Sequence, residues 1–380
     1  MVEEGEGFLE AAAGTTVKVE VIRDFADPYL ELVRLLREAT EIEHALLVQY
    51  LYAAFSIKPE YPLLSGFGFP NASDLLGIAV QEMQHLHHVN RMLVALGATP
   101  NLIRQDFPYE PDIYPFEFNL MPLSLLSVAK FTYAEAAASA LEPNPADPVQ
   151  EAFLERLFGA LRSSARPNHL GSLYHTIIEV TRELNIQRPA GLPDLSLWVL
   201  ILEQIKQQGE GEHFRTFHDV LMGTHAGFNG RPDVWLLPPN DPAYPSFNLP
   251  INPSAFEGHP NAIPQTQHRL LAWLSDLHYW IVLGLLDLHY RSNDPLPMAL
   301  AKSHMTGQLK SLGQHLASLG WGAPFDNLSM GYAFGISRET TVRLLRQLLF
   351  EADALEKRLQ AALPDDFPVT QTEESLALLI

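Results

Sequence analysis

The sequence predicts an all-α protein built around a bundle of four long helices. Apolar residues recur at spacings of three and four through several long stretches, as they do on the buried face of a helix. Proline and glycine mark the breaks between these stretches, and no segment shows the alternation typical of a strand. With 380 residues and a hydrophobic fraction of 47%, the chain can bury a large core.

The first pair of helices lies on either side of a loop rich in glycine, proline and aromatic residues. A helical pattern begins at Asp27 and continues for about thirty residues, until Pro59 ends it. Asn71 or Ser73 is expected to cap the second helix, which runs to about Leu96 and stops at a glycine.

The second pair follows a long connection over residues 98–150, which holds a short helix at about Leu123–Leu141. The third long helix is expected to begin near Pro167, and the fourth to run from Pro193 to a stop at Gly223. Two helical hairpins joined by one long crossover is the connectivity of ferritin-like bundles.

The chain divides into four segments on this pattern. We expect a leader over residues 1–26, the bundle over 27–225, a linker rich in Pro, Asn and Gly over 226–264, and a helical region packed on the bundle over 265–380. The last region should hold three helices, near Gln265–Tyr290, Pro297–Leu319 and Arg338–Leu363.

Composition excludes several functions. A net charge of -20 disfavours nucleic acid and anionic membrane surfaces as partners. The absence of cysteine excludes disulfides, thiolate zinc sites and all-cysteine iron–sulfur clusters, which leaves His, Asp and Glu as metal ligands. The acidic N-terminus lacks the apolar core of a signal peptide, and the later apolar stretches look too short to span a bilayer. We therefore expect a soluble, cytoplasmic protein.

Glutamate and histidine on the first pair of helices suggest a metal site. Glu82 and His85 are three residues apart, so both side chains lie on one helical face. Glu43 lies on the preceding helix among Leu, Ala and Val, where an unpaired buried charge would be costly. A metal ion or a buried partner would remove that cost.

The second pair of helices repeats the signal. Glu210 and His213 have the same spacing. Gly209 and Gly211 flank Glu210 inside the predicted helix, where each glycine costs about 1 kcal/mol relative to alanine. Two such glycines indicate close backbone packing or a π-bulge, a feature that occurs often at functional sites.

The third helix is expected to supply the remaining ligand. Glu179 lies in an apolar stretch and is our choice, with His175 as the alternative. Carboxylates and imidazoles in this number would hold two metal ions, with iron the first choice and manganese the alternative, and leave positions open for dioxygen. Tyr50 and Tyr174 are the candidate catalytic residues, and packing in the core is the alternative role for both.

Several segments together resemble a known family. EHALLVQYLYAAFSI and QEMQHLHHVNRMLVALGATP are similar to the ferritin-like region of the iminophenylpyruvate dimer synthases, which include the imine-dimer-forming enzymes of violacein and indolocarbazole biosynthesis. MPLSLLSVAKFTYAEA, QQGEGEHFRTF and AKSHMTGQLKSLGQHLASLGWGAPFDNL resemble further parts of the same family, in the same order. The resemblance covers the chain from about residue 30 to its end.

The resemblance implies an iron-dependent oxidative activity on small amino-acid-derived molecules. The best-known members couple two imines that an amino-acid oxidase supplies, and those enzymes are much longer than this chain. The resemblance also implies a glutamate on the third helix where this chain has Ser172. Glu179, seven residues on, or His175, one turn away, would have to replace it. In relatives an insertion separates the residues that match Glu210 and His213.

The sequence therefore favours a non-haem diiron oxidase or oxygenase that acts with dioxygen on a small amino-acid-derived natural-product intermediate. The alternative is a ferritin-like protein that binds metal without oxidative turnover, in iron handling or as a structural module. The long loops and extra C-terminal helices argue against simple storage. The sequence is compatible with a homodimer.

Overall fold

The computed structural model describes residues 21–104, 116–162, 169–231, 233–327, 334 and 337–379. Within these ranges the protein is all-α, as predicted, and its β features are two isolated bridges, Ile57 with Ser246 and Ser254 with Ala262. Most of the predicted leader lies outside the described residues, and residues 21–27 precede the first helix without regular structure. The division into four segments stays a prediction.

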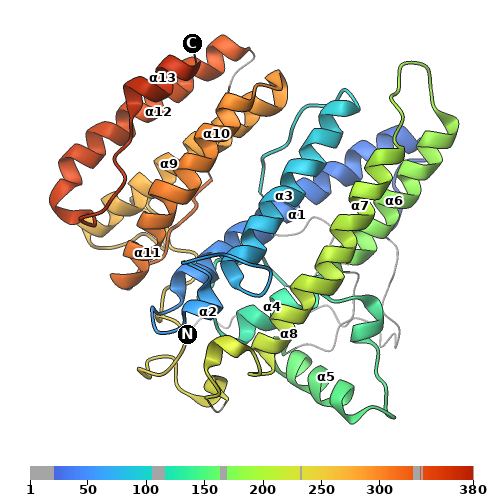
Figure 1. The fold of residues 1–380 in the computed structure, drawn as a ribbon, viewed down its shortest axis with the longest axis horizontal. Coiled ribbons are helices and arrows are strands. Elements are labelled where there is room, and N and C mark those ends of the chain that lie inside the picture. The colour runs from blue at the N-terminus through green and yellow to red at the C-terminus, as the bar shows by residue number, and fades with distance from the viewer. Residues whose placement is uncertain are drawn as a thin grey trace.

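The first hairpin consists of α1 (Pro28–Ser56) and α3 (Leu75–Ala95), which lie side by side in the middle of the molecule (Figure 1). The Asp27 side chain accepts a hydrogen bond from the Leu30 N–H at 2.9 Å and so caps α1 as the sequence suggests. Asp74, rather than Asn71 or Ser73, caps α3, because its carboxylate accepts the Gly77 N–H at 2.7 Å. The short α2 (Pro62–Ser65) lies between them.

The second hairpin pairs α6 (Leu170–Gln187) with a composite helix, and it packs on α1 through α6. The composite helix is continuous but changes type: α7 (Ser196–Gln208), the π-helix η2 (Gly209–His213) and α8 (Phe214–Leu221). A π-turn, one of the two alternatives that the paired glycines indicated, is therefore present. Pro167, the predicted start of the third helix, lies outside the described residues.

The crossover contains more helix than predicted. The expected short helix is α4 (Leu125–Glu135) followed by the 3₁₀ turn η1 (Ala138–Leu141), and α4 packs against α8 beneath the bundle. A further helix, α5 (Pro148–Leu161), was not predicted. Its Asp147 cap and the proline that follows are ordinary start signals that the sequence analysis did not use.

The C-terminal helices form a second layer that contacts α1 and α3 on the side away from α6 and α7 (Figure 1). They agree with the three predicted stretches, although the middle one is interrupted by a second π-turn and one short helix follows at the end. The elements are α9 (Thr266–Ser292), α10 (Pro295–His304), η5 (Met305–Leu309), α11 (Lys310–Ser318), α12 (Arg338–Leu359) and α13 (Thr372–Leu379). The predicted linker carries two short 3₁₀ turns, η3 (Ala226–Phe228) and η4 (Val234–Leu236).

Helix α9 is long and apolar enough to cross a membrane by length and composition alone. Of its most apolar stretch, however, 89% is buried inside the protein, which is the environment of a core helix. The absence of a membrane partner stays a prediction.

Candidate metal centre

Two groups of buried acidic and imidazole side chains meet at the centre of the bundle. One comprises Glu43, Glu82 and His85, and the other comprises Glu82, Glu135 and His213. In each group the facing side-chain atoms lie within 4.8 Å of one another. Glu82 belongs to both groups, so together they form one continuous cluster of five residues.

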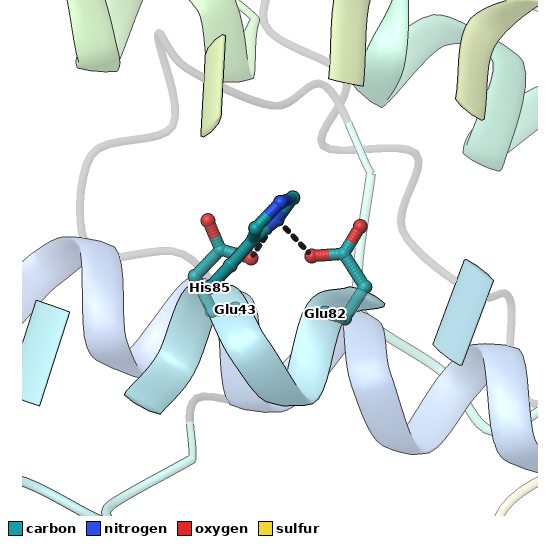
Figure 2. Close-up of side chains that lie close together, drawn as sticks. All are labelled: Glu43, Glu82 and His85. Carbon is teal, nitrogen blue, oxygen red and sulfur yellow. Dashed lines mark hydrogen bonds and ion pairs between the residues drawn. The ribbon is translucent and has the colours of Figure 1, made fainter. Parts of the chain in front are cut away.

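Glu82 of α3 sits between the two histidines. Its Oε2 lies 3.0 Å from Nδ1 of His85, and its Oε1 lies 2.8 Å from Nδ1 of His213. The other carboxylates flank this arrangement, with Glu43 Oε2 3.8 Å from Nδ1 of His85 and Glu135 Oε2 3.6 Å from Nδ1 of His213. Figure 2 shows the first group, in which the carboxylates of Glu43 and Glu82 turn toward the ring of His85.

A tyrosine holds the second oxygen of each flanking carboxylate. The Tyr174 hydroxyl donates to Oε1 of Glu43, and the Tyr50 hydroxyl donates to Oε1 of Glu135 at 2.6 Å. Both tyrosines are fully buried. The structure thus places the two predicted catalytic residues against the cluster, where each orients a carboxylate.

Apart from their contacts with one another, the atoms that face the centre lack hydrogen-bond partners. Among the described residues, this holds for Oε2 of Glu43, Oε1 of Glu82, Oε2 of Glu135 and Nδ1 of His213. Buried polar atoms without partners are rare and costly, so four of them aimed at one region need an explanation. Carboxylate oxygens and imidazole nitrogens at this spacing fit a pair of divalent cations.

The electrostatics of these side chains agree with this interpretation. Burial raises the pKa of Glu43 to about 8, and the charge of Glu82 adds to the effect. For Glu82 itself burial acts in the same direction, but the charges of His85 and His213 outweigh it and lower its pKa well below the ordinary value. Burial would lower the pKa of both histidines, yet Glu82 raises that of His213 to about 9 and that of His85 well above 6.5. Protons on the imidazoles therefore supply positive charge where cations would.

Glu135 is the residue that sequence reasoning missed. It ends α4 and is 2% exposed. The signal was present, because Glu135 is a carboxylate in the apolar stretch LLSVAKFTYAEAAA, and the same argument had identified Glu43. We had assigned the remaining carboxylate to the third long helix instead.

The structure corrects the prediction for Glu179. Its carboxylate forms an ion pair with Arg182, and its side chain is 53% exposed, so it does not reach the cluster. His175, the alternative, is half-buried and also belongs to neither group. Ser172 is buried near the start of α6, where its hydroxyl accepts the backbone N–H of His169 at 3.4 Å.

Glu210 lies just outside the cluster. Its Oε2 is 2.7 Å from Nζ of Lys206, and the π-turn separates it from the face that His213 presents. Glu210 nevertheless lines, with His85, Glu135 and Tyr174, a void of about 10 Å³ beside the cluster. That volume is about enough for one water molecule. Glu210 thus belongs to neither group of the cluster, and its pairing with His213 at a common ion stays a prediction.

A larger cavity of about 200 Å³ lies elsewhere, between α1, α9 and the loop after α3. Its lining includes Arg37, Asn101, Asp287 and Arg291, and none of the cluster residues. Its volume would admit a small molecule, but it does not open onto the cluster residues.

The fold and the comparisons define a class of protein. Residues 36–194 match the family described as Ferritin-like, which agrees with the all-α bundle and with the ferritin-like resemblance of the sequence segments. It is 27% identical over 408 aligned positions to the dichlorochromopyrrolate synthase of Lentzea aerocolonigenes. That alignment covers 88% of this chain and 39% of the relative, so the chain spans about two fifths of the relative's length. No solved structure matches the chain.

Proposed function

We propose that this protein is a dinuclear-metal oxidoreductase, with iron as the resident metal, that acts with dioxygen on a small amino-acid-derived natural-product intermediate. The observation that carries the proposal is a set of buried atoms on Glu43, Glu82, Glu135 and His213 that face one another around one region and make no hydrogen bond elsewhere in the described chain. Ferritin-like architecture and the similarity to a natural-product synthase support it.

The division of roles follows from the geometry. Glu82 would bridge two metal positions, since one of its oxygens faces each histidine. Glu43 with His85 would complete one position, and Glu135 with His213 the other. A pair of redox-active ions supplies electrons to dioxygen when bound. Tyr50 and Tyr174 orient the flanking carboxylates through their hydroxyls.

The first experiment measures metal content. Protein purified without chelators, or reconstituted anaerobically with ferrous iron, should hold two irons per chain by elemental analysis. The Glu82→Ala variant should lose both irons, because it removes the carboxylate that the two metal positions share. Equal iron in the variant and the wild type would contradict the proposal, as would a wild type that binds none.

A second candidate is a metal-binding protein without oxidative turnover. The observation that favours it is the size of the void beside the cluster, which holds about one water molecule and no organic substrate. Oxygen uptake by the ferrous protein separates the two functions: an oxidase consumes dioxygen in repeated turnovers with a reductant, whereas a structural site does not. A large spherical assembly in size-exclusion chromatography would indicate storage.

The proposal includes the protein's surroundings. We expect a cytoplasmic protein that forms a monomer or homodimer and binds neither nucleic acid nor membrane, given its charge of -20.

A further inference from the structure

The outer nitrogens of the two histidines are held in a reciprocal way. Nε2 of His85, on α3, lies 3.0 Å from Oε1 of Gln208, the last residue of α7. Nε2 of His213, on η2, lies 2.9 Å from Oε1 of Gln81, which is on α3. Helix α3 and the composite helix of α7 and η2 therefore each supply one histidine to the cluster. Each also supplies the glutamine that holds the histidine of the other.

One carboxylate fixes both glutamine amides. Nε2 of Gln81 lies 3.2 Å from Oε2 of Glu212, and Nε2 of Gln208 lies 3.4 Å from the same oxygen. An amide can turn over and exchange its donor and acceptor ends, but a carboxylate only accepts hydrogen bonds. Glu212 therefore keeps both amide nitrogens toward itself and both amide oxygens toward the imidazoles.

This orientation determines which imidazole nitrogen is available at the centre. An amide oxygen accepts only, so Nε2 of each histidine must carry the hydrogen. When an imidazole is neutral, its lone pair is then on Nδ1. In both histidines Nδ1 is the nitrogen that faces Glu82, at 3.0 Å in His85 and 2.8 Å in His213.

We propose that Glu212 is the positioning residue for both metal positions, because it sets the imidazole tautomer of His85 and His213 through Gln208 and Gln81. This inference rests on the proposed function. Glu212 is exposed and accepts a hydrogen bond from each of the two glutamine amides, so it acts through them. Because a single oxygen serves both glutamines, its loss affects both positions at once.

The test compares metal affinity in apoprotein variants by competition with a chromophoric chelator, using cobalt(II) alone as the probe. Glu212→Ala should weaken binding of both ions by about 10- to 100-fold, the range for groups that orient a ligating histidine. Gln81→Met should weaken one ion and Gln208→Met the other. Glu212→Gln keeps an acceptor oxygen and should retain most of the affinity.

A matched control is Glu203→Ala. Glu203 lies on α7, is partly exposed and pairs with Arg182 rather than with a glutamine, so its removal should leave both affinities unchanged. Nitrogen NMR of the zinc-loaded protein gives a second readout: both histidines should keep the hydrogen on Nε2 in the wild type, and Glu212→Ala should lose that uniform state.

The results distinguish this inference from the function on which it rests. A wild type that binds no cobalt or iron overturns the proposed function. A wild type that binds two ions, with Glu212→Ala at the same affinities, overturns only the role of Glu212. The same holds if Glu212→Gln is as weak as Glu212→Ala, since charge rather than amide orientation would then be responsible.

Discussion

At the scale of single residues, the cluster depends on buried carboxylates that, among the described residues, have no cationic Lys or Arg side chain beside them. Glu82 faces two imidazoles at once, and Glu43 and Glu135 each keep one oxygen for a tyrosine and one for the centre. Glu179, which had seemed equivalent, has a guanidinium partner and open solvent instead. All four residues are glutamates, so their burial and their hydrogen-bond partners decide which of them belong to the cluster.

Replacement of Glu135 tests this distinction. Glu135→Ala should remove one of the two ions, because the position at His213 loses one of its carboxylate ligands. Glu179→Ala should keep both ions. Elemental analysis of the two variants, purified side by side, makes the comparison. An opposite result, with iron lost in Glu179→Ala and retained in Glu135→Ala, would mean that the third long helix supplies the remaining ligand after all.

At the scale of elements, the π-turn η2 explains why the second Glu–His pair differs from the first. In α3 the spacing of three brings Glu82 and His85 to one face. In η2 the wider turn separates Glu210 from His213, and Glu210 pairs with Lys206. The carboxylate that lies beside His213 in the cluster therefore comes from Glu135, on α4 of the crossover.

The two glycines of η2 should respond differently to alanine. A Cβ added at Gly209 would lie 2.8 Å from Oε2 of Glu135. A Cβ added at Gly211 would have no such neighbour within 4 Å in the described part of the chain. Gly209→Ala should displace the Glu135 carboxylate and weaken metal binding at that position. Gly211→Ala should keep both ions and stabilise the protein by about 0.5–1 kcal/mol through helix propensity.

Thermal unfolding and metal titration of both variants check this prediction. Gly211→Ala serves as the control for adding a methyl group to the same turn. Equal metal affinity in both variants would mean that the glycine at position 209 does not make room for the carboxylate.

At the scale of the whole molecule, the cluster links stability to pH. The pKa of His213 is raised from 6.5 to about 9, and that of Glu43 from 4.5 to about 8, so the folded apoprotein holds protons that the unfolded chain releases. For His213 the stabilisation is complete below pH 6.5 and disappears as the pH rises through 9. The raised pKa of Glu43 acts in the same direction. Glu82, whose pKa is lowered, matters only in the acid range.

The apoprotein should therefore lose stability by on the order of a few kcal/mol between pH 6.5 and 9. Bound cations replace the protons, so the metal-loaded protein should lose much less. Denaturant unfolding of both forms across this range measures the difference. Glu82→Gln removes the charge that raises both histidine pKa values, and it should flatten the profile of the apoprotein; a flat profile in the wild type would contradict the argument.

The sequence was sufficient for features that depend on local pattern. Helical periodicity, caps and breakers predicted the four long helices and the C-terminal three, and the π-turn at residues 209–213 is one of the two alternatives that the paired glycines indicated. Glu43 stood out as a carboxylate among apolar residues, and Glu82, His85 and His213 through the repeated Glu–His spacing of three; all four meet in the structure.

The tertiary structure alone decided which residues complete the cluster. Glu135 and Glu179 both lie in apolar helical stretches, and nothing in their neighbours along the chain ranks one above the other. The packing of α4 against α8 buries Glu135 beside His213, while Glu179 falls on the solvent side of α6. Likewise, Gln81, Gln208 and Glu212 are unremarkable polar residues until α3 and η2 come together. Periodicity reports which face of a helix is buried, whereas contacts between helices depend on how those faces are paired in space.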